Sequence, residues 1–175
     1  MEYKSSLDLL AKVITAAAII ILAAVSYASF KELLAADGDM TTILIRSGII
    51  LLSALILLVC YWLSPRKYFV DNKELVIERP AKDVHILISD IEEVRPVVKG
   101  EMRWTIRTFG VGGLFGYYGK YYNSTFGSMT WYTTQLKNRV LIQTKSGKKI
   151  IITPDDITFS DTLKSKLKLL EQSRT

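Results

Sequence analysis

The sequence predicts two transmembrane α-helices followed by a mainly-β barrel or sandwich of about seven antiparallel strands, which a C-terminal amphipathic helix closes. Two long apolar runs occupy the first 63 residues, and short segments rich in β-branched and aromatic residues follow them. The charge divides at the same place: residues 1–63 contain 4 basic and 5 acidic side chains, whereas residues 64–175 contain 19 and 12. We therefore expect an apolar anchor over 1–64 and a basic module over 65–175.

The first apolar run, residues 13–30, contains no charged side chain. Eighteen helical residues at about 1.5 Å each span about 27 Å, which matches a bilayer core of about 30 Å. A cleaved secretory signal peptide is the alternative, because small residues follow Leu34. The apolar region of a signal peptide is usually about 7–15 residues long, and here a second apolar run follows at once. A membrane span is therefore favoured.

The second apolar run covers residues 43–63 and ends in Tyr61 and Trp62, whose rings suit a membrane interface. A polar connector, residues 31–42, joins the two runs and contains the turn signal Asp37-Gly38-Asp39. Two spans with so short a connector predict an antiparallel hairpin.

Arg46 is the only charged residue of the second run. We interpret it as a residue whose guanidinium extends to the lipid headgroups. The alternative is a buried functional charge, for which Asp37 or Asp39 is the natural partner.

Basic residues near the ends of the spans set the expected orientation. They are most numerous before the first span and after the second, at Lys4, Lys12, Arg66, Lys67, Lys73 and Arg79. Both termini and the β module should therefore be cytoplasmic. The single cysteine, Cys60, excludes an internal disulfide, and one cysteine with one histidine cannot form a Cys/His zinc site.

From Pro65 onward the sequence alternates between strand-like segments and turns. Pro96 indicates a strand at a sheet edge or a bulge, and Ser146-Gly147 is a two-residue hairpin signal. The predicted strands are 67–71, 74–78, 84–89, 90–98, 102–108, 129–135, 139–145 and 148–153.

Residues 107–131 hold six of the ten glycines, interleaved with aromatic residues. The spacing of these glycines excludes a Walker phosphate loop, and Tyr121 follows Lys120 where that motif needs Ser or Thr. We interpret the stretch as an irregular strand-and-loop excursion between two sheets. Its candidate interaction surface is Phe115, Tyr117, Tyr118, Lys120, Tyr121 and Tyr122.

The C-terminal helix is predicted over 154–172. Thr153 would cap it, Pro154 would occupy its first turn, and the acidic pair Asp155-Asp156 would complement its macrodipole. Its apolar positions fall on one face, so the helix should close one end of the barrel.

No catalytic, cofactor-binding or metal-ligating set stands out, because His85 has no evident partner and Asp155-Asp156 is explained by the helix start. Basic side chains could form a rim against an anionic membrane leaflet; the alternative is scattered surface charge. The candidate basic rim is Arg103, Arg107, Lys137, Arg139, Lys148 and Lys149. No dense basic run indicates nucleic acid.

Several segments of the soluble part resemble the bacterial pleckstrin-homology-like domains of small membrane proteins. They are KYFVDNKELVIER, ILISDIEEV, FGVGGLFGYYGKY, WYTTQLKNRVLIQTKSGKKIIITPDD and TFSDTLKSKL. The resemblance implies seven strands in two near-orthogonal sheets with a C-terminal helix, and it implies a binding or assembly scaffold without a reaction. Phosphoinositide specificity does not carry over, since no basic lipid-binding motif matches residue by residue.

The sequence thus predicts a two-span protein of the bacterial inner membrane that displays a non-enzymatic interaction module without a cofactor in the cytoplasm. Its expected partners are a second copy or another membrane protein. Binding of anionic lipid headgroups through the basic rim is the alternative.

Overall fold

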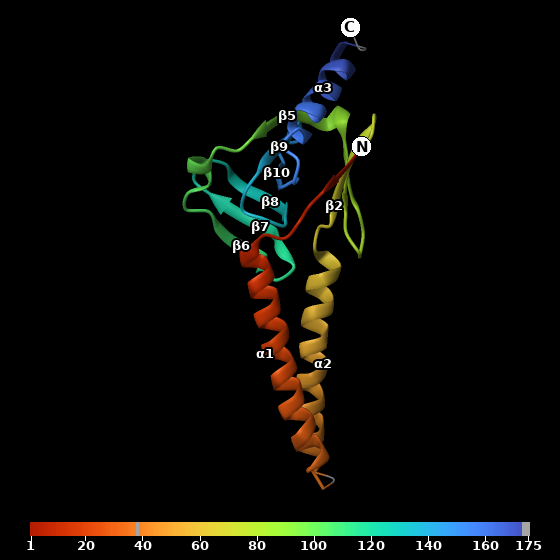
Figure 1. The fold of residues 1–175 in the computed structure, drawn as a ribbon, viewed down its shortest axis with the longest axis vertical. Helices are drawn as coiled ribbons and strands as arrows, with labels where there is room; N and C mark the ends of the chain where they lie inside the picture. Colours follow the sequence, from red (N-terminus) through yellow and green to blue (C-terminus); the bar gives the residue numbers. More distant parts are fainter. Residues whose placement is uncertain (38, 173–175) are drawn as a thin grey trace.

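The computed structural model describes residues 1–37 and 39–172, without the side chains of Lys99 and Glu171. Two long helices extend from one end of a β domain, and a third helix lies at the opposite end (Figure 1). The predicted combination of two apolar helices, a mainly-β domain and a C-terminal helix is confirmed. The predicted turn at 37–39 includes Gly38, which lies outside the described residues.

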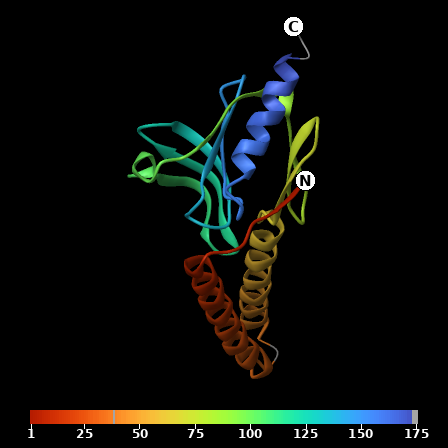
Figure 2. The same ribbon diagram turned by 45° about the horizontal axis from the view of Figure 1, so that its top comes forward.

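The helices α1 (Leu9–Leu34) and α2 (Met40–Leu63) contain the two predicted spans and are long and apolar enough to cross a membrane. Each begins at an aspartate that accepts hydrogen bonds from the first turn: Asp8 from the Ala11 amide and Asp39 from the amides of Thr41 and Thr42. The two helices converge at the connector and diverge toward the β domain (Figures 1 and 2).

Arg46 forms an ion pair with Glu32, at the end of α1 nearest the connector. The prediction that Asp37 or Asp39 would pair with a buried Arg46 is therefore wrong. Asp39 instead caps α2, while Glu32 lies on the last turn of α1 and meets Arg46 across the hairpin. Both side chains of the pair are partly exposed.

Within the described residues, the β domain consists of ten strands in two sheets that do not close into a barrel. The four-stranded sheet is antiparallel, in the order β1 (Glu2–Lys4), β2 (Lys67–Val70), β3 (Glu74–Glu78), β4 (Val84–Leu87). The six-stranded sheet has the order β5 (Ile91–Pro96), β9 (Val140–Thr144), β10 (Lys149–Ile152), β8 (Gly127–Thr133), β7 (Gly116–Asn123), β6 (Ile106–Gly113). Two 3-10 turns, Ile88–Asp90 and Lys99–Met102, flank β5.

One feature of the strand pairing confirms a prediction, and another contradicts one. Strand β5 is a sheet edge with a register shift between Ile91 and Glu93, as Pro96 predicted. Strands β10 and β8 pair in parallel, with Ile151 beside Trp131, although an antiparallel arrangement was predicted throughout. The hairpin β9–β10 brings β10 back beside β8 with the same direction, and local patterning carries no information on that choice.

Strand β1 precedes the helices and lies outside all of the strands predicted from the sequence. It pairs with β2, and the N-terminal amine donates to the Val70 carbonyl at 2.8 Å. Tyr3 is buried against Phe159 with ring centroids 5.0 Å apart. A three-residue strand with one apolar side chain has no detectable periodicity, which explains the omission.

The glycine-aromatic stretch forms paired strands within the six-stranded sheet, so its interpretation as an excursion between two sheets is wrong, although β6 has a register shift between Arg107 and Phe109. It builds the hairpin β6–β7 and leads into β8. Gly110 and Gly119 face each other across the hairpin, with φ values of +117° and +123° that favour glycine. A Cβ on Gly119 would lie 2.3 Å from the Phe109 carbonyl oxygen. Glycine therefore permits a close approach of two backbones within a continuous ladder.

A core covers part of each face of the six-stranded sheet. One face meets the four-stranded sheet and α3 through a core that includes Tyr68, Ile142 and Phe159. The other face packs Trp131 and Met129 against residues at the start of α1 and the segment before β6, including Ala11, Met102, Leu7 and Val97. The helix pair is thus joined to the β domain through this second core as well as through the chain itself.

Helix α3 (Phe159–Gln172) starts later than predicted. Asp155 does not serve the helix, because its carboxylate accepts bonds from the Ser6 amide and hydroxyl at 2.9 and 2.6 Å. Thr153 likewise accepts from the Thr134 amide. The apolar face does close one end of the domain, as predicted, because Phe159 and Leu163 are fully buried. Figure 2 shows α3 at the end of the β domain remote from α1 and α2.

Replacing Gly119 with Ala should lower the free energy of unfolding by about 1–3 kcal/mol, because a side chain at this φ is strained and its Cβ collides with backbone. Denaturant unfolding of the detergent-solubilised chain, followed by tryptophan fluorescence, measures the change. Gly100→Ala is the control, since a Cβ there meets no atom within 4 Å. Equal stability of the two variants would contradict the strain argument.

Candidate interaction surfaces around the glycine-aromatic hairpin

The tip of the β6–β7 hairpin lies between the ends of α1 and α2 that face the β domain (Figures 1 and 2). The Thr15 hydroxyl on α1 accepts from the Phe115 amide at 2.9 Å and donates to the Gly113 carbonyl at 3.2 Å. On the other side, the Phe115 ring meets Tyr61 of α2 edge-on, with centroids 5.6 Å apart. One hairpin turn therefore contacts both helices.

Close packing fixes the residue types at this junction. Ile14 lies against Gly113, where a Cβ would be 2.5 Å from the Ile14 Cδ1 atom. Phe115 has a φ of +57°, which is unfavourable for a bulky side chain. The hydrogen bond from the Phe115 amide to the Thr15 hydroxyl and the contact of the Phe115 ring with α2 hold that conformation. Thr15 is not among the residues predicted for the site, and the one signal for it in the sequence is a hydroxyl residue within an uncharged apolar run.

Three of the four tyrosines of the candidate interaction surface are buried, so their rings are not available for docking. Tyr117, Tyr118 and Tyr121 are only 4–6% exposed. Tyr121 stacks on Trp131 with centroids 4.1 Å apart, and the Tyr118 hydroxyl donates to the Cys60 carbonyl of α2. These tyrosines hold the hairpin on the second core and on α2.

Tyr117 links the hairpin to Asp8, the cap of α1. Its hydroxyl donates to Asp8 Oδ1 at 3.1 Å, and Asp8 Oδ2 also accepts from the Leu136 amide at 3.0 Å. Burial, together with the negative charge of Asp8, raises the pKa of Tyr117 to about 12. One carboxylate thus joins the first turn of α1, strand β7 and the loop after β8.

The exposed residues of the candidate interaction surface lie on the face of β6 and β7 that points away from the second core. Here Tyr122 and Lys120 reach solvent, and Phe115 is partly buried at the junction. Because β6 is the end strand of its sheet, a row of exposed apolar side chains borders an open edge. We call Trp104, Ile106, Phe109 and Tyr122 the β6 edge patch.

The candidate basic rim is divided among three places. Arg103 and Arg107 lie before and on β6, and Arg103 is close to the Trp104 ring. Lys137 lies in the loop after β8, while Lys148 and Lys149 lie at the start of β10. Arg139 is covered: its guanidinium lies 5.1 Å from the Trp131 ring centroid, and burial lowers its pKa.

A groove of about 1050 Å³ separates β4 from the exposed face of β6, β7 and β8. We call it the inter-sheet groove. Val59 and Leu63 of α2, Leu87 of β4 and Phe109 of β6 contribute apolar surface to it, and Lys120 contributes charge. The groove exists because the two sheets do not close and the four-stranded sheet leaves this half of the larger sheet uncovered.

The described residues contain no group of three or more His, Cys, Asp or Glu side chains that could hold a metal ion. His85 lies 3.0 Å from Glu74 Oε2, and both side chains are partly exposed on the four-stranded sheet. Asp156 accepts from the Thr158 amide at the approach to α3, and Asp155 binds the N-terminal segment. These acids therefore have structural partners.

In comparison with known proteins, a family model described as a bacterial PH domain matches residues 66–167. No curated protein and no solved structure shows significant similarity. The matched range begins just after α2 and includes strands β2 to β10 and most of α3.

Replacing Thr15 with Val should leave the buried Phe115 amide and Gly113 carbonyl without their partner, at a cost of about 1–3 kcal/mol. Hydrogen exchange should then speed up at the hairpin tip by about tenfold or more. Thr15→Ser keeps the hydroxyl and should exchange like the wild type. Unchanged exchange in the Val variant would show that the junction does not depend on this hydroxyl.

Tyr117 should make the protein sensitive to alkaline pH. Its folded-state pKa of about 12 lies above the unfolded value near 10. Its contribution to stability is therefore fully present below about pH 10 and is lost as the pH rises toward about 12. Denaturant unfolding between pH 8 and 12 should give a shallower decline for Tyr117→Phe than for the wild type. The Phe variant should also be less stable at pH 8, since the bond to Asp8 is gone. Equal slopes would contradict this role.

Proposed function

Because the chain belongs to the bacterial PH domain family, we propose that it is a membrane-anchored, non-enzymatic interaction module that binds a protein partner along the open edge of β6. The observation that carries this proposal is the combination of an unpaired edge strand with the exposed β6 edge patch.

The edge supplies backbone groups for a partner. Strand β6 spans Ile106–Gly113 and has a neighbouring strand only on its β7 side. Such an edge is a ready template for an added strand, and proteins usually protect it with charge, a bulge or a covering segment. In β6 a register shift lies between Arg107 and Phe109, and Gly113 at the hairpin tip packs against Ile14 of α1, so an added strand would pair with the part of β6 that precedes Gly113.

The edge patch supplies the side-chain contacts. Trp104 and Phe109 are 80% and 79% exposed, unusually large values for aromatic side chains, and Ile106 is 60% exposed. Trp104 also has a φ of +59°, an unfavourable conformation for this residue. Large aromatic side chains dominate the energy of protein interfaces when a partner covers them. The patch therefore has the chemistry of an interface core.

The charge beside the patch favours one kind of partner. Arg103 and Arg107 flank Trp104 and Ile106, and no ion pair joins either arginine to an acid among the described residues. A second copy would bring four arginines together if the two edges paired symmetrically. A membrane protein that presents an apolar strand with acidic neighbours fits better. Self-association is the alternative outcome.

The helix pair would hold this edge near a membrane. The excess of basic residues at the β-domain ends of α1 and α2 supports a cytoplasmic β domain in a bacterial inner membrane. Thr15 lies inside the predicted span that starts at residue 13, so the hairpin tip would reach the interface. The partner would then be met close to the lipid headgroups.

Binding of anionic headgroups through the basic rim is a second and weaker candidate. The six rim residues lie at three places, and Arg139 is covered by Trp131. Only Lys148 and Lys149 of this set line the inter-sheet groove. Because these charges are spread over three places, each contributes little to the affinity for one anionic headgroup.

A photoreactive amino acid at Ile106, in the full chain in native membranes, should capture a partner protein or a second copy. The same amino acid at Leu169, an exposed apolar position on α3, is the matched control. Trp104→Ala should reduce capture from position 106 several-fold without changing the unfolding midpoint, because the side chain is exposed. Equal capture from positions 106 and 169, or monomer alone at both, would contradict the proposal.

A further inference from the structure

We propose that the inter-sheet groove binds one anionic membrane lipid, with an acyl chain along its apolar wall and the phosphate-bearing headgroup among its basic side chains. This site adjoins the protein-binding edge and shares Phe109 with the β6 edge patch. It rests on the proposed membrane placement of α1 and α2, and its location, apolar lining and unpaired charge each support it.

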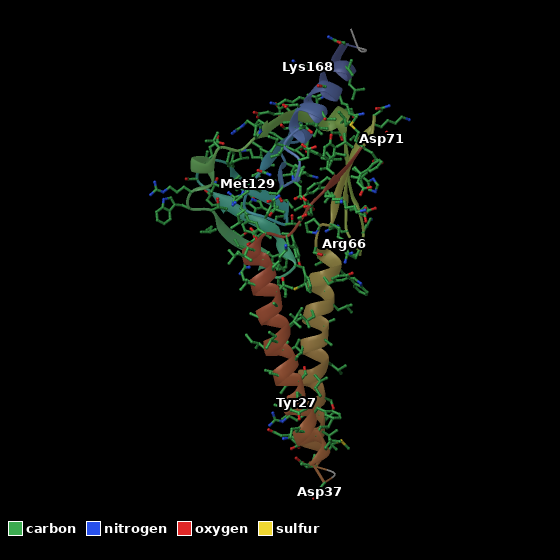
Figure 3. The ribbon with its side chains drawn as sticks, in the orientation of Figure 1. Tyr27, Asp37, Arg66, Asp71, Met129 and Lys168 are labelled. Atoms are coloured by element: carbon green, nitrogen blue, oxygen red, sulfur yellow. The ribbon has the colours of Figure 1, made fainter. Side chains whose placement is uncertain are left out.

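The groove starts at the end of a predicted membrane span. Val59 and Leu63, from the last two turns of α2, line it, and α2 ends at Leu63. The Trp62 carbonyl accepts from the Ala81 amide at 3.0 Å, so the β3–β4 turn lies directly on this helix end. Figure 3 places Arg66 at the same end of α2. A lipid beside α2 could therefore reach the groove without crossing water.

The walls continue the apolar surface of α2. Leu87 of β4 is 49% exposed and Phe109 is largely exposed, although both line a concave surface. Val111 and Tyr118 lie side by side on the β6–β7 floor. The volume of about 1050 Å³ lies at the upper end of the range of about 300–1,000 Å³ for small-molecule sites. When a hydrocarbon chain covers apolar walls of this extent, the free energy falls, because apolar surface is removed from water.

The charges of the groove select an anion. Four basic residues line it against one carboxylate, that of Asp90: they are Arg79, Lys120, Lys148 and Lys149. None of the four forms an ion pair within the part of the chain that the structure describes.

Three of these cations are already positioned by neutral neighbours, and one of the three is Lys149, whose Nζ donates to the Phe126 carbonyl at 2.8 Å. The Arg79 guanidinium lies over the Tyr132 ring at 5.4 Å, with Nε donating to the Lys82 carbonyl. Lys120 Nζ donates to Thr130 Oγ1 at 2.7 Å. None of these contacts neutralises charge, so a phosphate would be the counter-ion.

The test uses the full chain in nanodiscs of phosphatidylcholine and phosphatidylglycerol, with a photoactivatable diazirine in the acyl chain of one lipid. Mass spectrometry then locates the labelled peptides. The phosphatidylglycerol probe should label α1 and α2, and it should also label the β4 and β6 peptides around Leu87 and Phe109. The phosphatidylcholine probe should label α1 and α2 but label β4 and β6 far less.

The charge requirement is tested with Lys120→Ala/Lys148→Ala, which should reduce β4 and β6 labelling by about tenfold while labelling of α1 and α2 stays constant. Lys164→Ala/Lys168→Ala removes the same charge from α3 and should change nothing, because neither lysine lines the groove; Figure 3 shows Lys168 at the end of the molecule remote from α2. Excess glycerol phosphate that abolishes labelling of β4 and β6 would support recognition of the headgroup.

Labelling confined to α1 and α2 would overturn the groove site and leave the membrane anchor intact. Equal labelling of β4 and β6 by both probes would overturn the selection of an anionic lipid. Absence of label from all three regions, α1, α2 and the β domain, would overturn the membrane placement and the groove site with it. An unchanged unfolding midpoint in the lysine variants shows that they fold, so lost labelling reports binding.

Discussion

The seat of the β6–β7 hairpin between α1 and α2 is the constraint on which the rest of the structure depends. The hairpin tip brings backbone groups against two apolar helices, where no water can pair with them. Thr15 satisfies the Phe115 amide and the Gly113 carbonyl, and the Tyr118 hydroxyl reaches the Cys60 carbonyl on the other helix. Because one turn is held by both helices, the β domain is tied to the helix pair at more than the two chain connections.

The glycines of β6 and β7 make this packing of the hairpin between α1 and α2 possible. Gly110 and Gly119 let two strands approach closely, and Gly113 admits the side chain of Ile14. The aromatic residues between them are divided by strand alternation. Tyr117 and Tyr121 face the second core, while Tyr118 faces α2 and Tyr122 reaches solvent. The stretch that has the composition of a binding loop is therefore mostly a structural joint, and its exposed part lies along the β6 edge.

Two open sheets distinguish this domain from a closed barrel and create both surfaces considered for function. The end of the six-stranded sheet leaves β6 unpaired beside exposed apolar side chains. The uncovered face of β6, β7 and β8 forms the floor of the inter-sheet groove next to α2. The chain belongs to the bacterial PH domain family, whose match begins just after α2 and includes the strands from β2 to β10. We propose a protein strand for the edge and an amphiphile for the groove, because the groove joins an apolar path from α2 to cations that form no ion pair among the described residues.

The sequence by itself determined the two apolar helices, the basic β module, the apolar face of α3 and the family. Each of these follows from the local periodicity, the composition or a motif of the sequence. Pro96 even indicated the edge position of β5. Only the tertiary structure decided that Glu2–Lys4 joins the β domain, that Asp155 binds Ser6 instead of capping α3, and that three tyrosines are buried. Strand alternation assigns side chains to two faces but does not say which face is covered. Here one face of β7 meets the second core, and the other meets α2 at one end and solvent at the other. That division depends on contacts between residues about 100 positions apart in the chain, such as Thr15 with Phe115.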